Sequence, residues 1–229
     1  MRKKLDVSAY LVLGPENTGR RQVADVVRDA VANGFSCVQL RSKTASAREM
    51  IALARETAEV LKALNKSDEV ALLIDDRLDV VLAAREQGVK VDGIHVGQKD
   101  IPVSICRKYL GDRAVIGLSA PTVQLLSVLE SEDMRYIDYL GAAPYHETMT
   151  KTDLERDTDG TIITQTDDLL KKLTQKSPLP VVVGGGVKLS DVPAIKRTGA
   201  AGFFVITAIT DAVDVKIAAK EMSEAWKRA

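Results

Sequence analysis

The chain has 229 residues, of which 45% are hydrophobic and 28% are charged, a balance typical of a globular protein with a sizeable core. Its 32 basic and 32 acidic residues leave no net charge, which argues against a nucleic-acid or membrane-surface binder, and no apolar run approaches the ~18 residues that a bilayer requires. Cys37 and Cys106 form no Cys-x-x-Cys pair, so we expect neither a disulfide scaffold nor a structural zinc site, and we expect a cytoplasmic location.

Short apolar runs alternate with longer amphipathic stretches along the whole chain. Continuous rather than alternating hydrophobicity is typical of strands that are buried on both faces of a parallel sheet. The intervening stretches favour helices, as in the i, i+3, i+4 spacing of Val23, Val26 and Val27. We therefore predict strands at 9–13, 37–40, 71–74, 93–96, 115–118, 136–140, 181–183 and 203–206.

Eight strands that are each followed by helical sequence predict an α/β protein of the (β/α)8 TIM-barrel class. A doubly wound open sheet is the competing architecture, and the regular recurrence of the strand–helix unit favours the barrel. The polar interval 141–162 is longer than the others and indicates a lid or an insertion. With no linker or low-complexity tract, we expect residues 1–229 to form a single domain.

Polar residues follow the second predicted strand. Active sites of such barrels lie at the C-terminal ends of the strands, so these residues are candidates for a site. Gln39 and Arg41 alternate with apolar residues, so both side chains can point inward. Arg41 and Lys43 suit phosphate oxygens, although a solvated loop would carry the same residues.

Three carboxylates follow the third and fourth predicted strands, at Asp75, Asp76 and Asp100. Unpaired, they would repel one another, and a hard cation such as Mg2+ would resolve this by bridging carboxylates to substrate phosphates. Taken singly, each has an ordinary explanation: Asp76 as a salt-bridge partner of Arg77, and Asp100 as a helix N-cap. Their coincidence at adjacent strand ends favours a metal site.

The seventh strand is followed by Gly184, Gly185 and Gly186, and the eighth ends near Thr207. Glycine lets backbone N–H groups approach an anion closely, and this is where barrels commonly bind phosphate. A triple glycine is also an ordinary turn, but its position here favours phosphate binding.

Ser119 follows the fifth predicted strand, and the two histidines of the chain are His95 and His146. No His–Asp pair accompanies Ser119, so we expect no nucleophile triad. His95 lies within an apolar run, which favours a packed structural role. The polar stretch 144–153 carries hydroxyls and Lys151, and it would be able to close over a charged substrate; an exposed loop without a role is the alternative.

These segments resemble, in chain order, the motifs of the thiamine phosphate synthase family. Residues 38–43 (V-Q-L-R-S-K) resemble V-Q-L-R-x-K, and residues 73–79 (L-I-D-D-R-L-D) resemble I-I-N-D-R-x-D. Residues 93–100 (G-I-H-V-G-Q-K-D) resemble G-V-H-L-G-Q-x-D, and residues 148–153 (T-M-T-K-T-D) resemble T-x-T-K-x-D. Further matches at 117–119, 185–186 and 205–209 extend the resemblance over nearly the whole chain.

The resemblance implies a (β/α)8-barrel transferase that uses Mg2+ to join hydroxymethylpyrimidine diphosphate to a thiazole phosphate, giving thiamine phosphate and pyrophosphate. It implies Asp76 and Asp100 as Mg2+ ligands, and Ser119 and Lys151 as catalytic residues. The two small phosphorylated substrates are its partners, and a homo-oligomer is compatible with the sequence. Substrate binding is implied for Gln39, Arg41, Lys43, Asp75, Ser119, Thr148, Thr150, Lys151, Gly186, Ile206 and Thr207.

Three positions depart from the family pattern: Asp75 stands where Asn is usual, Pro121 where His is usual, and Ala143 where Gly is usual. That His is the catalytic residue of the related thiazole tautomerases, so Pro121 argues against their activity. A tautomerase-like or catalytically degenerate barrel that binds thiamine-pathway phosphates is the alternative function. We expect Asp75 to be a further Mg2+ ligand; protonation, or pairing with Arg77 or a lysine, are the alternatives.

Overall fold

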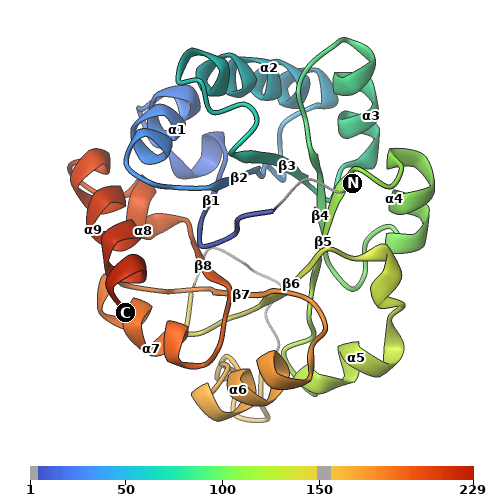
Figure 1. The fold of residues 1–229 in the computed structure, drawn as a ribbon, viewed down its shortest axis with the longest axis vertical. Helices are drawn as coiled ribbons and strands as arrows, with labels where there is room; N and C mark the ends of the chain where they lie inside the picture. Colours follow the sequence, from blue (N-terminus) through green and yellow to red (C-terminus); the bar gives the residue numbers. More distant parts are fainter. Residues whose placement is uncertain (1–4, 149–155) are drawn as a thin grey trace.

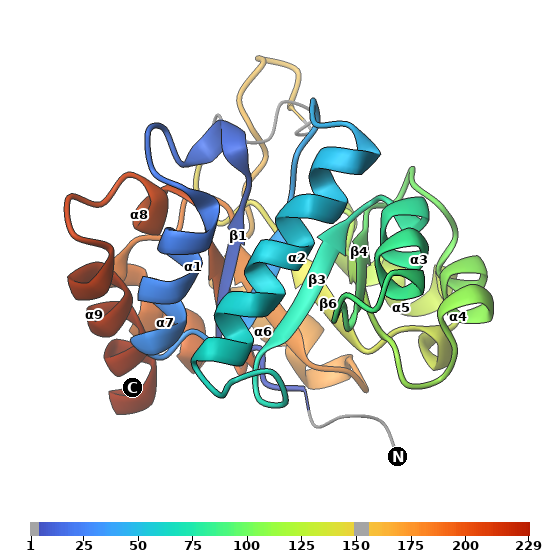
Figure 2. The ribbon, with the colours of Figure 1, turned by 90° about the horizontal axis from the view of Figure 1, so that it is seen from above.

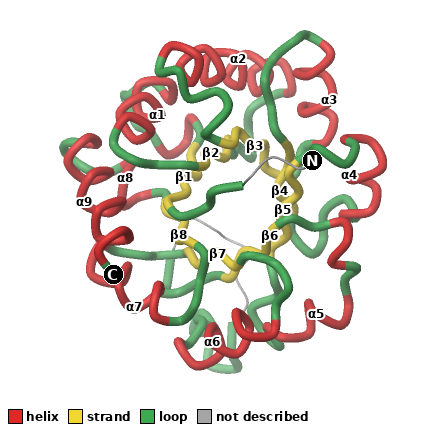
Figure 3. The backbone as a smooth tube through the Cα atoms, viewed as in Figure 1, coloured by secondary structure: helices red, strands yellow, loops and turns green. Residues whose placement is uncertain are grey.

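The computed structural model describes residues 5–148 and 156–229. Within these ranges eight parallel strands pair in chain order, and β1 pairs with β8 to close a barrel. Figure 1 looks into this ring, and Figure 3 shows the strands enclosed by the helices. The strands are β1 (Ala9–Leu13), β2 (Cys37–Leu40), β3 (Ala71–Asp75), β4 (Gly93–Val96), β5 (Val115–Ser119), β6 (Tyr139–Ala142), β7 (Val181–Gly184) and β8 (Gly202–Val205).

Helices follow the strands and cover the outer face of the barrel (Figure 2). The predicted TIM barrel is therefore confirmed, and the open-sheet alternative is wrong. The helices of the described residues are α1 (Val23–Ala32), α2 (Ala47–Ala63), α3 (Leu78–Glu86), α4 (Val103–Leu110), α5 (Val128–Ser131), α6 (Asp167–Lys176), α7 (Val192–Arg197), α8 (Thr207–Thr210) and α9 (Val215–Arg228).

The sixth strand begins three residues later than predicted. Residues Met134–Tyr136 form a 3-10 turn instead, because the Asp133 side chain accepts a hydrogen bond from the Arg135 backbone N–H at 3.0 Å. This cap gives the Arg135 backbone N–H an acceptor, so that N–H does not need a partner on a neighbouring strand. The sixth strand also ends two residues later than predicted, at Ala142, whereas the bounds of the other seven strands agree with the prediction to within one residue.

Side chains alternate along each strand between the outside and the inside of the barrel, so the strands contribute to two separate cores. Outward residues such as Leu11 and Leu72 pack against the helices. Inward residues such as Tyr10, Leu73 and Tyr139 fill the barrel interior. The inward set includes polar groups, so the barrel is not filled by hydrocarbon alone.

A buried ion pair joins α4 to the N-terminal ends of β5 and β6. Arg107 donates to Asp138 Oδ2 at 2.6 Å and to the Ala114 carbonyl at 2.7 Å. The same Asp138 oxygen accepts from the Ile116 backbone N–H at 2.8 Å. This pair lies at the opposite end of the barrel from the C-terminal strand ends, so its role is in stability.

Across the described parts of the chain, none of the helices has both the length and the apolar character that crossing a bilayer demands.

Candidate active site

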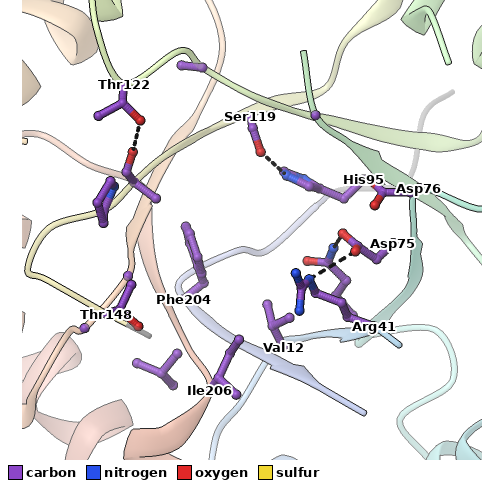
Figure 4. Close-up of a pocket in the computed structure, with 18 of the residues that line it drawn as sticks. Val12, Arg41, Asp75, Asp76, His95, Ser119, Thr122, Thr148, Phe204 and Ile206 are labelled. Carbon is purple, nitrogen blue, oxygen red and sulfur yellow. Dashed lines mark hydrogen bonds and ion pairs between the residues drawn. The ribbon is translucent and has the colours of Figure 1, made fainter. Parts of the chain in front are cut away.

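A cavity of about 470 Å3 opens at the C-terminal ends of the strands (Figure 4). Its apolar lining includes Val12, Phe204 and Ile206. The charged part of its lining comes from β2, β3 and β4 and the loops that follow them, with Arg41, Lys43, Asp75, Asp76, Lys99 and Asp100. A cavity with an apolar wall and a few converging polar groups is suited to a ring that carries an anionic group.

Asp75 lies at the end of β3 and is surrounded by donors. Its Oδ2 lies 3.2 Å from Arg41 Nε and 3.4 Å from Lys43 Nζ, and its Oδ1 accepts from Gln39 Nε2 at 2.6 Å. Burial raises the pKa of Asp75, whereas the charges of Lys43 and Arg41 act to lower that pKa. The predicted inward orientation of Gln39 and Arg41 is consistent with these contacts.

Asp76 and Asp100 face each other beside this cluster. Burial raises the pKa of Asp100, and a hydrogen bond with Asp76 raises it further. Lys43 Nζ also contacts the Asp76 carboxylate. Asp76 has a φ of 58°, in the left-handed region that a non-glycine residue adopts at a cost, and such strain is common at functional sites.

The ordinary explanations for the two carboxylates are wrong. Arg77 pairs with Asp79, its Nη2 lying 2.6 Å from Asp79 Oδ2, and not with Asp76. Helix α4 begins at Val103 with Pro102 at its N-cap, so Asp100 does not cap it. Asp100 instead accepts from the Gly97 backbone N–H at 2.8 Å.

The donor set fits a magnesium ion held by two carboxylates. Mg2+ in phosphate-transfer sites usually binds one or two carboxylates and completes its shell with water and substrate phosphate. Within residues 5–148 and 156–229, no group of three or more His, Cys, Asp or Glu side chains has metal-binding geometry. Asp75 faces Gln39, Arg41 and Lys43, so the geometry favours the pairing with a lysine over a third carboxylate ligand.

Ser119 and His95 lie on neighbouring strands and contact each other in the pocket (Figure 4). His95 Nε2 lies 3.0 Å from Ser119 Oγ, and His95 Nδ1 lies 2.8 Å from the hydroxyl of Tyr139. The expected packed role of His95 is therefore wrong. Its neighbours Ile94 and Val96 point outward, so alternation along β4 turns the imidazole into the barrel.

The opposite end of the pocket is built from the turns after β7 and β8, and Gly186, Ile206 and Thr207 line it. Gly185 and Gly186 have φ angles of 83° and 71°, which glycine adopts without strain. A Cβ at Gly186 would lie 2.9 Å from the His146 Cβ, so only glycine allows the loop after β6 to pack here. His146 N donates to the Gly185 carbonyl at 2.9 Å and holds that loop in place.

The lid candidates fall into two groups. Thr148 lines the pocket, whereas Thr150 and Lys151 lie outside the described residues. Pro121 also lines the pocket, so the position at which tautomerases carry a histidine offers no titratable group here.

Glu16 also supports the site, although the sequence did not indicate a role for it. It lies in the turn after β1, and its Oε1 accepts from Ser42 Oγ at 2.5 Å, from Thr44 Oγ1 at 2.8 Å and from Lys43 N at 3.1 Å. Glu16 thereby fixes the loop that presents Lys43. No local signal marks this role, because the donors follow a different strand.

A family model described as thiamine monophosphate synthase matches residues 9–209. The chain belongs to the thiamine monophosphate synthase family. A thiamine-phosphate synthase of Corynebacterium efficiens is 37% identical over 214 residues, covering 93% of this chain and 92% of that protein. One of Syntrophomonas wolfei is 37% identical and covers 97% of this chain and 98% of that protein. The resemblance found in the sequence motifs is confirmed.

Solved structures support the same architecture. Thiamine phosphate pyrophosphorylase from Pyrococcus furiosus superposes with a TM-score of 0.77 at 24% identity, covering 98% of this chain and 97% of that one. A 3-hexulose-6-phosphate synthase superposes with a TM-score of 0.61 at 15% identity, covering 96% of this chain and 99% of that one. At these identities the two matches establish the barrel fold alone.

Proposed function

We propose that this chain joins hydroxymethylpyrimidine diphosphate to a thiazole phosphate, giving thiamine phosphate and pyrophosphate. The observation that carries the proposal is the pairing of two anion-binding ends across one apolar cavity. One end holds Arg41 and Lys43 beside Asp76 and Asp100. The other end is formed by the glycine-rich turn after β7 and the start of α8 after β8. Such a cavity can hold a diphosphate and a monophosphate with two rings between them.

The diphosphate end has the charges that a leaving pyrophosphate needs. Arg41 and Lys43 would contact its oxygens, and Asp75, which accepts a hydrogen bond from Gln39, would orient these cations. Asp76 and Asp100 would hold Mg2+, which would neutralise charge that develops on the leaving group. Thr148, together with Thr150 and Lys151 from the segment outside the described residues, would close over this end.

The thiazole phosphate would bind at the other end through backbone donors. Thr207 begins α8, and the first N–H groups of a helical turn lack acceptors within the helix. Gly186, with no Cβ, leaves its backbone open to an approaching anion, and Ile206 and Thr207 face the same space. These backbone groups bind phosphate without requiring a cationic side chain.

The reaction requires no protein nucleophile. The C–O bond between the pyrimidine methylene and the diphosphate breaks, and its electron pair leaves with pyrophosphate. The ring amino group stabilises the resulting cation, and the thiazole nitrogen lone pair forms the new C–N bond. Ser119 lines the pocket, and its hydroxyl would lie beside the reacting groups. Val12 and Phe204 provide an apolar wall that keeps water from capturing the cation.

The test is incubation of the purified protein with both precursors and Mg2+, with thiamine phosphate and pyrophosphate measured. A parallel incubation with a thiazole carboxylate phosphate tests the tautomerase alternative, which Pro121 disfavours because proline has no titratable group. Binding of both precursors without turnover would identify the catalytically degenerate barrel.

We also propose that the protein works in the cytoplasm. Cys37 and Cys106 are both buried, and no disulfide bond joins them within the described residues, as a reducing compartment favours.

A further inference from the structure

A chain of hydrogen bonds runs beneath the pocket and begins at Ser119. Ser119 Oγ lies 3.0 Å from His95 Nε2, and the other ring nitrogen of His95 lies 2.8 Å from the hydroxyl of Tyr139. The Tyr139 hydroxyl in turn lies 2.8 Å from the hydroxyl of Tyr10. Both tyrosines are fully buried inside the barrel, so the contact between their hydroxyls is shielded from solvent.

The chain continues from Tyr10 to the charged end of the pocket. The Tyr10 hydroxyl donates to Gln39 Oε1 at 2.7 Å, and Gln39 Nε2 donates to Asp75 Oδ1 at 2.6 Å. Continuous hydrogen bonds therefore connect Ser119 on β5 with Asp75 on β3.

Asp75 determines the direction of the donors in this chain. Arg41 Nε at 3.2 Å and Lys43 Nζ at 3.4 Å face one of its oxygens, so the carboxylate accepts on that side. On the other side, if the amide oxygen of Gln39 faced Asp75 Oδ1, two hydrogen-bond acceptors would be in contact. The amide nitrogen of Gln39 must therefore face Asp75, and the amide oxygen must face Tyr10.

Each later link follows because a hydroxyl has a single proton. Tyr10 uses its proton on Gln39, so Tyr139 must donate to Tyr10. Tyr139 has then used its own proton, so His95 must donate to Tyr139 from Nδ1. A neutral imidazole with a proton on Nδ1 has a bare Nε2, which must accept the proton of Ser119.

We propose that Asp75 sets the tautomer of His95 and, through it, the direction of the Ser119 hydroxyl. His95 carries its proton on Nδ1, and Ser119 turns its proton toward His95. The oxygen lone pairs of Ser119 therefore face the pocket. Tyr10, Tyr139 and His95 act as positioning residues for Ser119.

Gly117 shows that the barrel is built to permit this contact. A Cβ at Gly117 would lie 2.3 Å from the Tyr139 hydroxyl oxygen and 2.5 Å from His95 Nδ1. Any larger residue would therefore separate the two groups. The glycine at this position lets His95 and Tyr139 meet across β5.

Replacement of Asp75 by asparagine reverses every link. The Oδ1 of the amide would face Arg41 and Lys43, so its Nδ2 would face Gln39. Gln39 would then turn its own oxygen toward residue 75 and donate to Tyr10. Tyr10 would then donate to Tyr139, and Tyr139 would donate to His95 Nδ1. His95 would carry its proton on Nε2 and donate it to Ser119.

The direction of the Ser119 hydroxyl matters for the reaction, and this role rests on the proposed function. Ser119 is then an acceptor for a donor on the substrate, such as the amino group of an aminopyrimidine. Positive charge reaches that amino group as the C–O bond breaks, which makes its N–H groups stronger donors. An accepting Ser119 therefore stabilises the transition state more than the bound substrate.

The experiment is 15N NMR of protein labelled at histidine, without substrate, at about pH 8.5, well above the ordinary histidine pKa of about 6.5. The two ring nitrogens have distinct shifts in each tautomer. The chain has two histidines, so His146→Gln assigns the signals of His95. The native protein should show the Nδ1–H tautomer, and Asp75→Asn should show the Nε2–H tautomer.

Tyr10→Phe tests whether the coupling passes through the chain. This variant removes a hydroxyl that bonds to Gln39 and Tyr139, and His95 should then have the same tautomer whether residue 75 is Asp or Asn. An Nε2–H tautomer or a doubly protonated ring in the native protein would overturn the proposal. An unchanged tautomer in Asp75→Asn, or one that still follows residue 75 after Tyr10→Phe, would overturn it too.

A kinetic measurement separates this proposal from the proposed function. Tyr10→Phe should lower kcat about tenfold and change KM for the diphosphate less than about twofold, because the loss falls on the transition state. A native protein with no turnover but with the expected tautomers would contradict the proposed function alone. A native protein with normal turnover but the wrong tautomer would contradict this inference alone.

Discussion

The ammonium of Lys43 contacts the carboxylate of Asp76, one of the two carboxylates proposed to hold Mg2+. A bound Mg2+ would therefore compete with Lys43 for the same carboxylate. We predict that Lys43→Met tightens metal binding about threefold, a modest effect because the lysine side chain is 56% exposed. The same change should raise KM for the pyrimidine diphosphate about tenfold, because a phosphate contact is lost.

Binding of Mn2+ followed by electron paramagnetic resonance, together with steady-state kinetics, measures both effects. Lys62→Met is the matched control, because Lys62 is an exposed lysine of α2 outside the pocket, and both quantities should stay unchanged. Weaker metal binding in Lys43→Met would show that Lys43 and the metal do not compete.

Asp100→Asn should lower kcat/KM about a hundredfold and weaken Mg2+ binding, because one of two carboxylate ligands loses its charge. The circular dichroism spectrum should not change. Asp79→Asn is the control, since Asp79 pairs with Arg77 and lies outside the main pocket. Full activity in excess chelator would remove the metal from the mechanism.

The carboxylate of Glu16 should give the Lys43 loop a pH-dependent stability. Burial acts to raise the pKa of Glu16, but hydrogen bonds from Ser42 and Thr44 outweigh it and lower that pKa from 4.5 to about 2. A depressed pKa in the folded state stabilises the fold above the unfolded pKa, and this stabilisation is lost as pH falls from about 4.5 toward about 2. Glu16 is exposed, so we discount the effect to about 1 kcal/mol.

Urea unfolding at pH 7 and at about pH 2.5 measures this contribution. Glu16→Gln should be about 1 kcal/mol less stable than the native protein at pH 7 and should approach it in acid. Glu56→Gln, at an exposed position of α2, is the control. An equal difference at both pH values would show that the charge of Glu16 does not matter.

Asp138→Ala should destabilise the fold by about 3 kcal/mol, because it leaves the buried Arg107 guanidinium without its counter-charge. The thermal midpoint should fall by roughly 10 °C. Arg107→Met combined with Asp138→Ala should recover part of the loss. At a temperature where all variants are folded, kcat/KM should stay within about twofold, since the pair lies at the opposite end of the barrel. A selective loss of activity would contradict this assignment.

The barrel and half of the pocket were predictable because their signals are local. Continuous apolar runs marked the buried strands, and alternation at the end of β2 placed Gln39 and Arg41 inside. The error at His95 came from treating Gly93–Val96 as a uniformly apolar run, although the outward orientation of Ile94 and Val96 places the residue between them inside.

The remaining contacts were not predictable because barrel closure creates them. Tyr139 is 44 residues from His95 and 129 residues from Tyr10, yet it contacts both. Glu16 reaches a loop 26 residues away. The sequence placed a carboxylate at position 75, but its role depends on Arg41 and Lys43, which only the folded barrel brings to it.

The most direct measurement follows pyrophosphate and thiamine phosphate together by 31P NMR in one incubation with both precursors and Mg2+. We predict that the two products appear in equal amounts and that neither forms when the thiazole phosphate is omitted. Pyrophosphate released without thiamine phosphate, or binding of both precursors with no product, would contradict it.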